Sequence, residues 1–138
     1  MTRKEDWPQR LEKYVNNVSD KEFDWETHHC LIFADGALEA VTGERLYNQY
    51  RAEYETESNK DLMDELGARG IYRKLVSIFG KSIPVSMAQR GDIVILKNPY
   101  SVGVCRGATS NFVGNDGEAQ GVVEVPTLSC KYAFKVGR

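Results

Sequence analysis

The sequence predicts an α+β fold in which N-terminal helices pack on a C-terminal antiparallel sheet. Apolar residues recur at helical spacing through a helical half of about residues 5–80. From Ile83 onward they alternate with polar residues, which is typical of strands, over a sheet half of about residues 83–136. A chain of 138 residues suits one hydrophobic core, so we expect a single domain over residues 1–138.

The most apolar helix is expected near the middle of the first half. Thr27 is its predicted N-cap, and Gly43 is a C-terminal glycine signal. The residues between them are apolar on nearly every face, which predicts a central, buried position. The other predicted helices are one capped by Asp6 with Gln9 three residues later, one over Glu44–Tyr54, one from Ser58 to Gly67 and one from Ile71 to Gly80.

The second half predicts five strands joined by turns. They are expected over Ile93–Leu96, Tyr100–Arg106, Asn111–Gly114 and Ala119–Glu124, with the last through Tyr132, Phe134 and Val136. Asn98-Pro99 and Asn115-Asp116-Gly117 are predicted turns, the second a strong hairpin signal. Arg90-Gly91-Asp92 matches a cell-adhesion tripeptide, but a turn before a strand explains it better.

Composition and charge exclude several classes of partner. The formal net charge of −2 gives no electrostatic reason to expect a nucleic acid partner or binding to an anionic membrane. No apolar run approaches the ~20 residues that span a bilayer, and the N-terminus lacks the apolar segment of a secretory signal. Three widely spaced cysteines predict reduced thiols in a protein made in a cytoplasm.

Cys30 is the first candidate for chemistry. In the first turn of a buried helix, its thiol would face the positive end of the helix dipole, which favours the thiolate. A nucleophilic cysteine also needs a base within hydrogen-bond reach. The alternative is that Cys30 is a small apolar residue of the core.

Two segments of the chain resemble the NlpC-like peptidoglycan peptidases. Glu26-Thr27-His28-His29-Cys30 followed by LIFADGALEAVTG resembles their nucleophile helix, and RGDIVILKNPYSVGVCRG resembles their Gly-Asp strand and the strand that follows. This resemblance implies a papain/NlpC-like fold. Over roughly residues 20–136 the chain resembles, more closely, a group of short phage proteins encoded among tail-tip genes.

That resemblance implies a structural component of a bacteriophage tail tip or baseplate. Such a component would be made in the host cytoplasm and located in the virion. It would act as an assembly adaptor, in several copies, beside other tail proteins such as hub or distal tail proteins. The resemblance implies no cofactor.

The chain departs from the peptidases at the catalytic base. Ser101 stands where they place a histidine, before Val-Gly, and the only histidines are His28 and His29. Serine cannot act as a base near neutral pH, and adjacent residues at a helix start point in different directions. We therefore interpret Cys30 as a remnant nucleophile and the two histidines as improbable bases.

Several alternatives stay open at this level. The main one is an active cysteine hydrolase, a peptidoglycan endopeptidase or amidase, that uses Cys30 with an atypical base. A metal site would need His28, His29 and Cys30 to converge with each other or with Cys105 and Cys130; the expectation is no metal. Cys105 shares a strand face with Ser101 and is expected near Cys30. The tyrosines between Tyr47 and Tyr54 form either an interaction surface, as in a host-directed binding protein, or an inner helix face.

Overall fold

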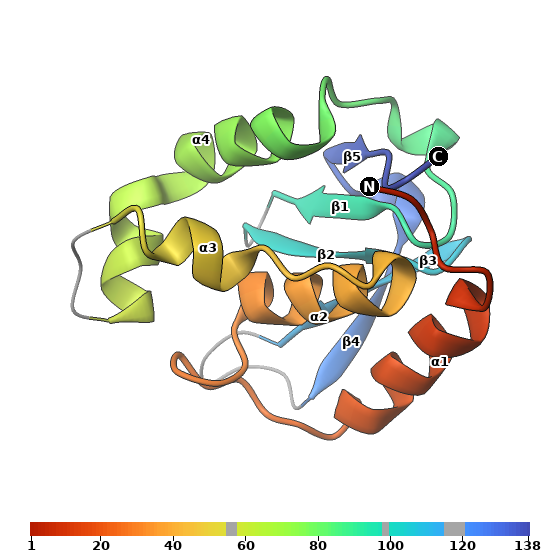
Figure 1. Ribbon diagram of the computed structural model, residues 1–138, viewed down its shortest axis with the longest axis horizontal. Coiled ribbons are helices and arrows are strands. Elements are labelled where there is room, and N and C mark those ends of the chain that lie inside the picture. Colours follow the sequence, from red (N-terminus) through yellow and green to blue (C-terminus); the bar gives the residue numbers. More distant parts are fainter. Residues whose placement is uncertain (55–57, 98–99, 115–120) are drawn as a thin grey trace.

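The computed structural model describes residues 1–54, 58–97, 100–114 and 121–138, and it confirms the α+β prediction (Figure 1). Helices occupy the first part of the chain and strands the second. The helices are α1 (Trp7–Val18), α2 (Cys30–Thr42), α3 (Tyr47–Arg51) and α4 (Asn59–Phe79). The strands are β1 (Ile93–Leu96), β2 (Ser101–Cys105), β3 (Thr109–Val113), β4 (Val122–Pro126) and β5 (Tyr132–Phe134). None of these helices combines the length and apolar character needed to cross a membrane.

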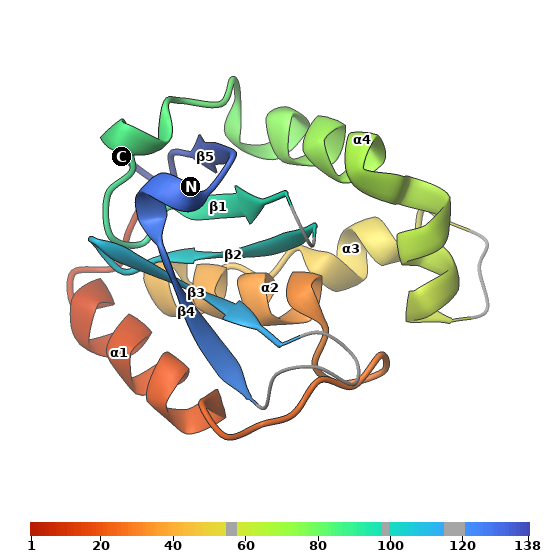
Figure 2. The same cartoon turned by 180° about the vertical axis from the view of Figure 1, so that it is seen from behind.

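The five strands form one antiparallel sheet in the order β4-β3-β2-β1-β5 (Figure 2). The register pairs Ile93 with Val104 and Ile95 with Val102, and these four side chains belong to the core that contains α2. The predicted turns at 98–99 and 115–117 lie outside the described residues. The predicted pairing of the strands that flank 115–117 is confirmed, because β3 pairs with β4.

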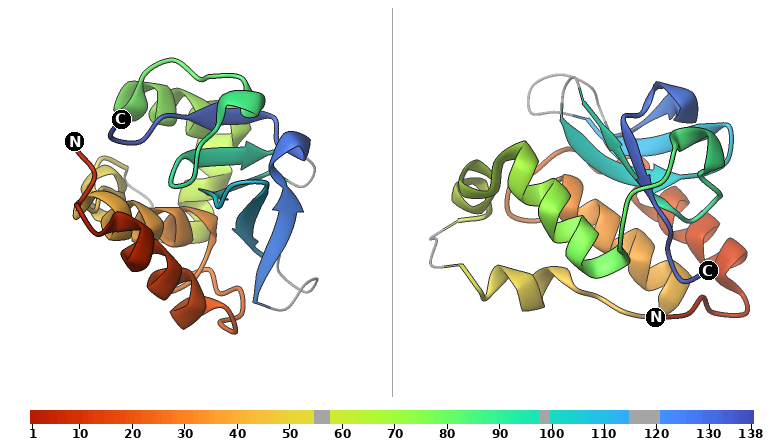
Figure 3. Two further views of the ribbon diagram at one scale, coloured as in Figure 1. Left: turned by 90° about the vertical axis from the view of Figure 1, so that its right-hand side faces the viewer. Right: turned by 90° about the horizontal axis from the view of Figure 1, so that it is seen from above.

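Helix α2 lies between α1 and the sheet, as its apolar sequence predicts (Figure 3). Phe33, Ala37 and Val41 are completely buried. The contact with α1 depends on Gly36, because a Cβ there would overlap the ring of Tyr14. The Tyr14 hydroxyl instead crosses Gly36 and donates to the Phe33 carbonyl at 2.9 Å. A glycine inside this helix is therefore required by close packing.

The remaining helices differ in detail from the prediction. Asp6 makes no side-chain cap to α1, so the predicted capping box is wrong there. Helix α3 is shorter than the predicted Glu44–Tyr54, since the Leu46 N–H donates to the Asp35 carboxylate at 2.7 Å before the helix begins. The two predicted helices between Ser58 and Gly80 are joined in α4, with Gly67 at the break in a left-handed φ of 60°.

A second, smaller core covers the opposite face of the sheet. Its buried members are Val94, Cys105, Phe112, Cys130 and Ala133. The short 3₁₀ helices η1 (Val85–Met87) and η2 (Thr127–Ser129) lie at its edge. The sheet is thus buried on both faces, and α2 covers only one of them.

A buried carboxylate joins the two ends of the chain at the start of β1. Asp92 is 0 % exposed and accepts hydrogen bonds from the backbone of Gln89 at 2.9 Å and of Val136 at 3.1 Å. The guanidinium groups of Arg3 and Arg138 complete its shell. The adhesion tripeptide therefore has its aspartate turned inward, and this carboxylate is inaccessible to a receptor.

We expect Asp92→Asn to lower the free energy of unfolding by about 3 kcal/mol, because it leaves two largely buried guanidinium groups without their counter-charge. Urea titration measures the loss. Glu39→Gln is the matched control, because the Arg45–Glu39 pair is about half exposed and surface pairs contribute about 1 kcal/mol or less. Equal losses in the two variants would contradict the assigned role of Asp92.

Candidate functional site

Cys30 is the first residue of α2, so its predicted place in the first turn of a buried helix is confirmed. The predicted N-cap is wrong: the cap is His29, whose Nδ1 accepts the Leu31 N–H at 3.2 Å. The physical reason lies upstream, where the Asp24 carboxylate accepts the N–H groups of Glu26 and Thr27. Thr27 therefore belongs to this turn, and the helix begins only after His29.

The Cys30 thiol is a buried, protonated group at neutral pH. The residue is 8 % exposed, and burial raises the pKa of the thiol above its ordinary value. Several donors act in the opposite direction, in order the Val102 N–H, the Ser101 hydroxyl and the N–H groups at the start of α2. They favour the thiolate but do not offset desolvation, so the helix start alone does not activate this cysteine.

Ser101 lies beside the Cys30 thiol, at the first position of β2. It is close enough to influence the pKa of the thiol. Its hydroxyl is buried and makes no well-formed hydrogen bond to any described residue. The nearest polar side chain of β2 to the sulfur thus carries a hydroxyl, which cannot accept a proton at neutral pH.

His29 is the centre of a buried hydrogen-bond chain. Since Nδ1 accepts from Leu31, a neutral ring carries its proton on Nε2, which faces the Tyr47 hydroxyl at 3.1 Å. Tyr47 donates to Asn59 Oδ1 at 2.8 Å, and the Asn59 amide donates to the Trp25 carbonyl at 3.0 Å. The chain therefore connects the start of α2 to α3 and α4.

This arrangement keeps His29 neutral and occupies both of its ring nitrogens. Burial, with a smaller contribution from His28, lowers the pKa of His29 to about 4. A protonated ring would present a second N–H to the Leu31 N–H and lose the cap. His29 is therefore a structural acceptor and donor, and neither nitrogen is directed at the Cys30 sulfur.

His28 is also buried, at 2 % exposure, and its ring meets Phe33 edge-on. Its Nε2 makes no hydrogen bond to any described residue, and burial lowers its pKa. Within the described chain, no hydrogen bond joins either histidine to Cys30.

The other two cysteines lie away from Cys30. The prediction that Cys105 lies near Cys30 is wrong, because Val102 and Val104 are the β2 residues that face α2. Cys105 and Cys130 belong to the core on the opposite face of the sheet. Among the described residues, no three His, Cys, Asp or Glu side chains come together as metal ligands. Because Cys105 and Cys130 lie on the other face of the sheet, they are not positioned to share a metal ion with Cys30.

Sequence reasoning missed the partners of His29. Tyr47 appeared only as a member of an aromatic stripe, and Asn59 had no signal at all. Residues 29, 47 and 59 are joined only by tertiary packing, so no local spacing marks them as a group.

The buried, neutral His29 predicts a pH-dependent stability. Its pKa is about 4 in the folded chain, against 6.5 for an ordinary histidine. Between these values the unfolded chain binds more protons, so stability is full above pH 6.5 and falls as the pH drops toward 4. A shift of this size corresponds to about 3 kcal/mol, and denaturant titrations across this range measure it.

Two variants isolate the contribution of His29. His29→Asn keeps an acceptor for the Leu31 N–H but removes the titrating ring, so it should lose this part of the pH dependence. Tyr47→Phe also removes the hydrogen bond between Tyr47 and His29, but it keeps the imidazole ring of His29. The stability of this variant should therefore remain pH dependent. An unchanged pH dependence in His29→Asn would contradict the assignment.

The poorly bonded hydroxyl of Ser101 predicts an unusual response to truncation. Ser101→Ala should leave the free energy of unfolding unchanged or raise it by about 1 kcal/mol, because the buried hydroxyl makes no well-formed hydrogen bond and the neutral Cys30 thiol beside it is only a weak acceptor. Ser110→Ala is the matched control on β3, since the Ser110 hydroxyl bonds Thr127 Oγ1 at 2.8 Å and its loss should cost about 1 kcal/mol. A larger loss for Ser101 than for Ser110 would refute this assignment.

Comparison with known proteins adds the family. No curated protein and no solved structure matches the chain. One family model matches residues 2–136, nearly the whole length. On this evidence the chain belongs to the DUF6950 family, which is described as a domain of unknown function.

Proposed function

We propose that the chain is a structural, non-catalytic component of a bacteriophage tail tip or baseplate, in which a peptidase-like outline acts as an assembly adaptor. The observation that carries the proposal is the surroundings of Cys30. Its buried thiol stands at a helix start, as a nucleophile would, but it faces the hydroxyl of Ser101 and no imidazole.

The chemistry of this arrangement argues against a working dyad. Thiol proteases need a base that takes the proton of the thiol and returns it to the leaving group. Ser101 cannot do this, and His29 uses both ring nitrogens in the hydrogen-bond chain to Leu31 and Tyr47. With burial raising the pKa of the thiol, Cys30 is left as a packed side chain.

The assembly role rests on the resemblance of roughly residues 20–136 to short phage proteins encoded among tail-tip genes. On this proposal the protein would be made in the host cytoplasm and located in the virion. Its partners would be other tail or baseplate proteins, such as hub or distal tail proteins, in a copy number set by the symmetry of the tail.

One observation favours the alternative, a cysteine hydrolase that cuts peptidoglycan or an amide. The groups around the Cys30 sulfur are mostly donors, among them the Val102 N–H and the Ser101 hydroxyl, and donors stabilise a thiolate. A rearrangement that admits water and a base to this pocket would make Cys30 reactive.

We expect the protein in purified particles of the phage or prophage that encodes it, and we expect Cys30→Ala to be incorporated as well as the natural chain. Mass spectrometry of gradient-purified tails measures incorporation, and plaque titre measures function. The physical reason is that a packed thiol contributes only volume, which alanine largely retains. Both should therefore stay within about threefold of the natural chain.

Cys105→Ala is the matched control, since Cys105 is also buried but lies on the other face of the sheet. The hydrolase alternative predicts that Cys30→Ala abolishes peptidoglycan cleavage and plaque formation while Cys105→Ala retains both. Absence of the chain from purified particles would overturn the assembly proposal directly.

A further inference from the structure

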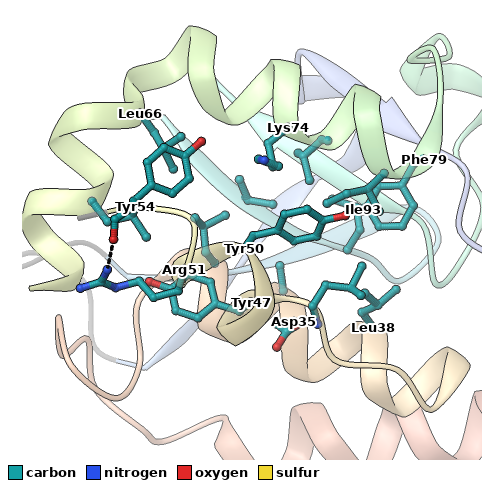
Figure 4. A pocket seen from close by; sticks show the side chains of 17 residues that line it. Asp35, Leu38, Tyr47, Tyr50, Arg51, Tyr54, Leu66, Lys74, Phe79 and Ile93 are labelled. Atoms are coloured by element: carbon teal, nitrogen blue, oxygen red, sulfur yellow. Dashed lines mark hydrogen bonds between the residues drawn. The ribbon is translucent and has the colours of Figure 1, made fainter. Parts of the chain in front are cut away.

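A half-open cavity of about 90 Å³ lies between α2, α3 and α4, with β1 and β2 as its floor (Figure 4). Its walls are aliphatic and aromatic side chains from all five elements, among them Leu38, Tyr50, Leu66, Phe79 and Ile93. The tyrosines of α3 and the chain after it, whose role the sequence left open, line this cavity and so form an inner face.

The charged residues in the wall already have partners. The Asp35 carboxylate accepts the Leu46 N–H at 2.7 Å. The Lys74 ammonium bonds the Glu53 carboxylate at 3.0 Å and lies 4.5 Å from the centre of the Tyr50 ring. Arg51 donates to the Tyr54 carbonyl at 3.4 Å. These contacts hold the charges at the margin and leave the interior surface apolar.

A concave recess lined mostly by apolar side chains is the usual form of a small-molecule site. The 90 Å³ is several times the roughly 10–15 Å³ that one water needs. The described walls offer water few polar partners, and an enclosed apolar cavity of about 150 Å³ binds benzene or xenon. The cavity is therefore suited to an apolar occupant.

We propose that this cavity is a binding site for one uncharged apolar group, the size of a single aromatic ring or a short alkyl chain. The site is separate from the Cys30 thiol and does not depend on the assembly role. Tyr47 connects them, because it lines the cavity and accepts the hydrogen bond of His29. An occupant would therefore contact Tyr47, a member of the hydrogen-bond chain that holds the first turn of α2 in place.

Benzene is the probe for the first test. Because it binds only the folded chain, a concentration ten times its Kd should raise the melting temperature by about 3–8 °C. Methyl shifts in NMR spectra should be confined to wall residues such as Leu31, Ala34 and Ile78. Benzoate, which has the same ring and a charge, should produce neither effect, because an ion gains nothing from an apolar site.

Two substitutions that fill the cavity, Ala34→Leu and Ile78→Phe, should abolish the benzene effect. Leu96→Phe adds comparable bulk on the other face of the sheet and should retain it. No stabilisation by benzene, an equal effect with benzoate, or methyl shifts spread over the surface would overturn the proposal. If the filling variants do not fold, the methyl shifts of the natural chain decide the question alone.

Discussion

The contact between α2 and the sheet is the constraint on which the rest of the structure depends. The face of α2 that meets Val102 and Val104 fixes how far along β2 the helix begins, and this places Cys30 beside Ser101. Its opposite face receives α1 so closely that only glycine fits at position 36. Helices α3 and α4 lie beside the part of α2 that α1 and the sheet leave uncovered, and the apolar cavity is the space between these three helices.

Burial explains the pKa shifts of both Cys30 and His29. It raises the pKa of the Cys30 thiol and so suppresses the thiolate that the helix start and its donors would favour. The same loss of water lowers the pKa of His29, and neutrality is what the cap requires of it. At both residues desolvation therefore favours the neutral form of the side chain.

The large elements could be predicted from the sequence because their signals are local. In α2, β1 and β2 the pattern of apolar residues within each segment is enough to identify the element. The prediction of the N-cap failed because a local turn, in which the Asp24 carboxylate accepts the N–H groups of Glu26 and Thr27, precedes the helix. The position of Cys105 failed for another reason: alternation separates the two faces of a strand but does not say which face meets the helix. The hydrogen-bond chain through Asn59 depends on contacts distant in sequence, and no local pattern encodes those.

The Asp92 cluster has a consequence for the order in which the chain folds. Beside it, Arg3 donates to the carbonyl of Val136 across 133 residues of sequence. Ideal-chain scaling puts the entropy cost of closing such a loop at about 4 kcal/mol before any constant term. These contacts can form at a small entropy cost only after α2 and the sheet have already brought the two ends of the chain together (Figure 1). The ion cluster is therefore expected to form after the transition state of folding. Its loss should speed unfolding and leave the folding rate nearly unchanged.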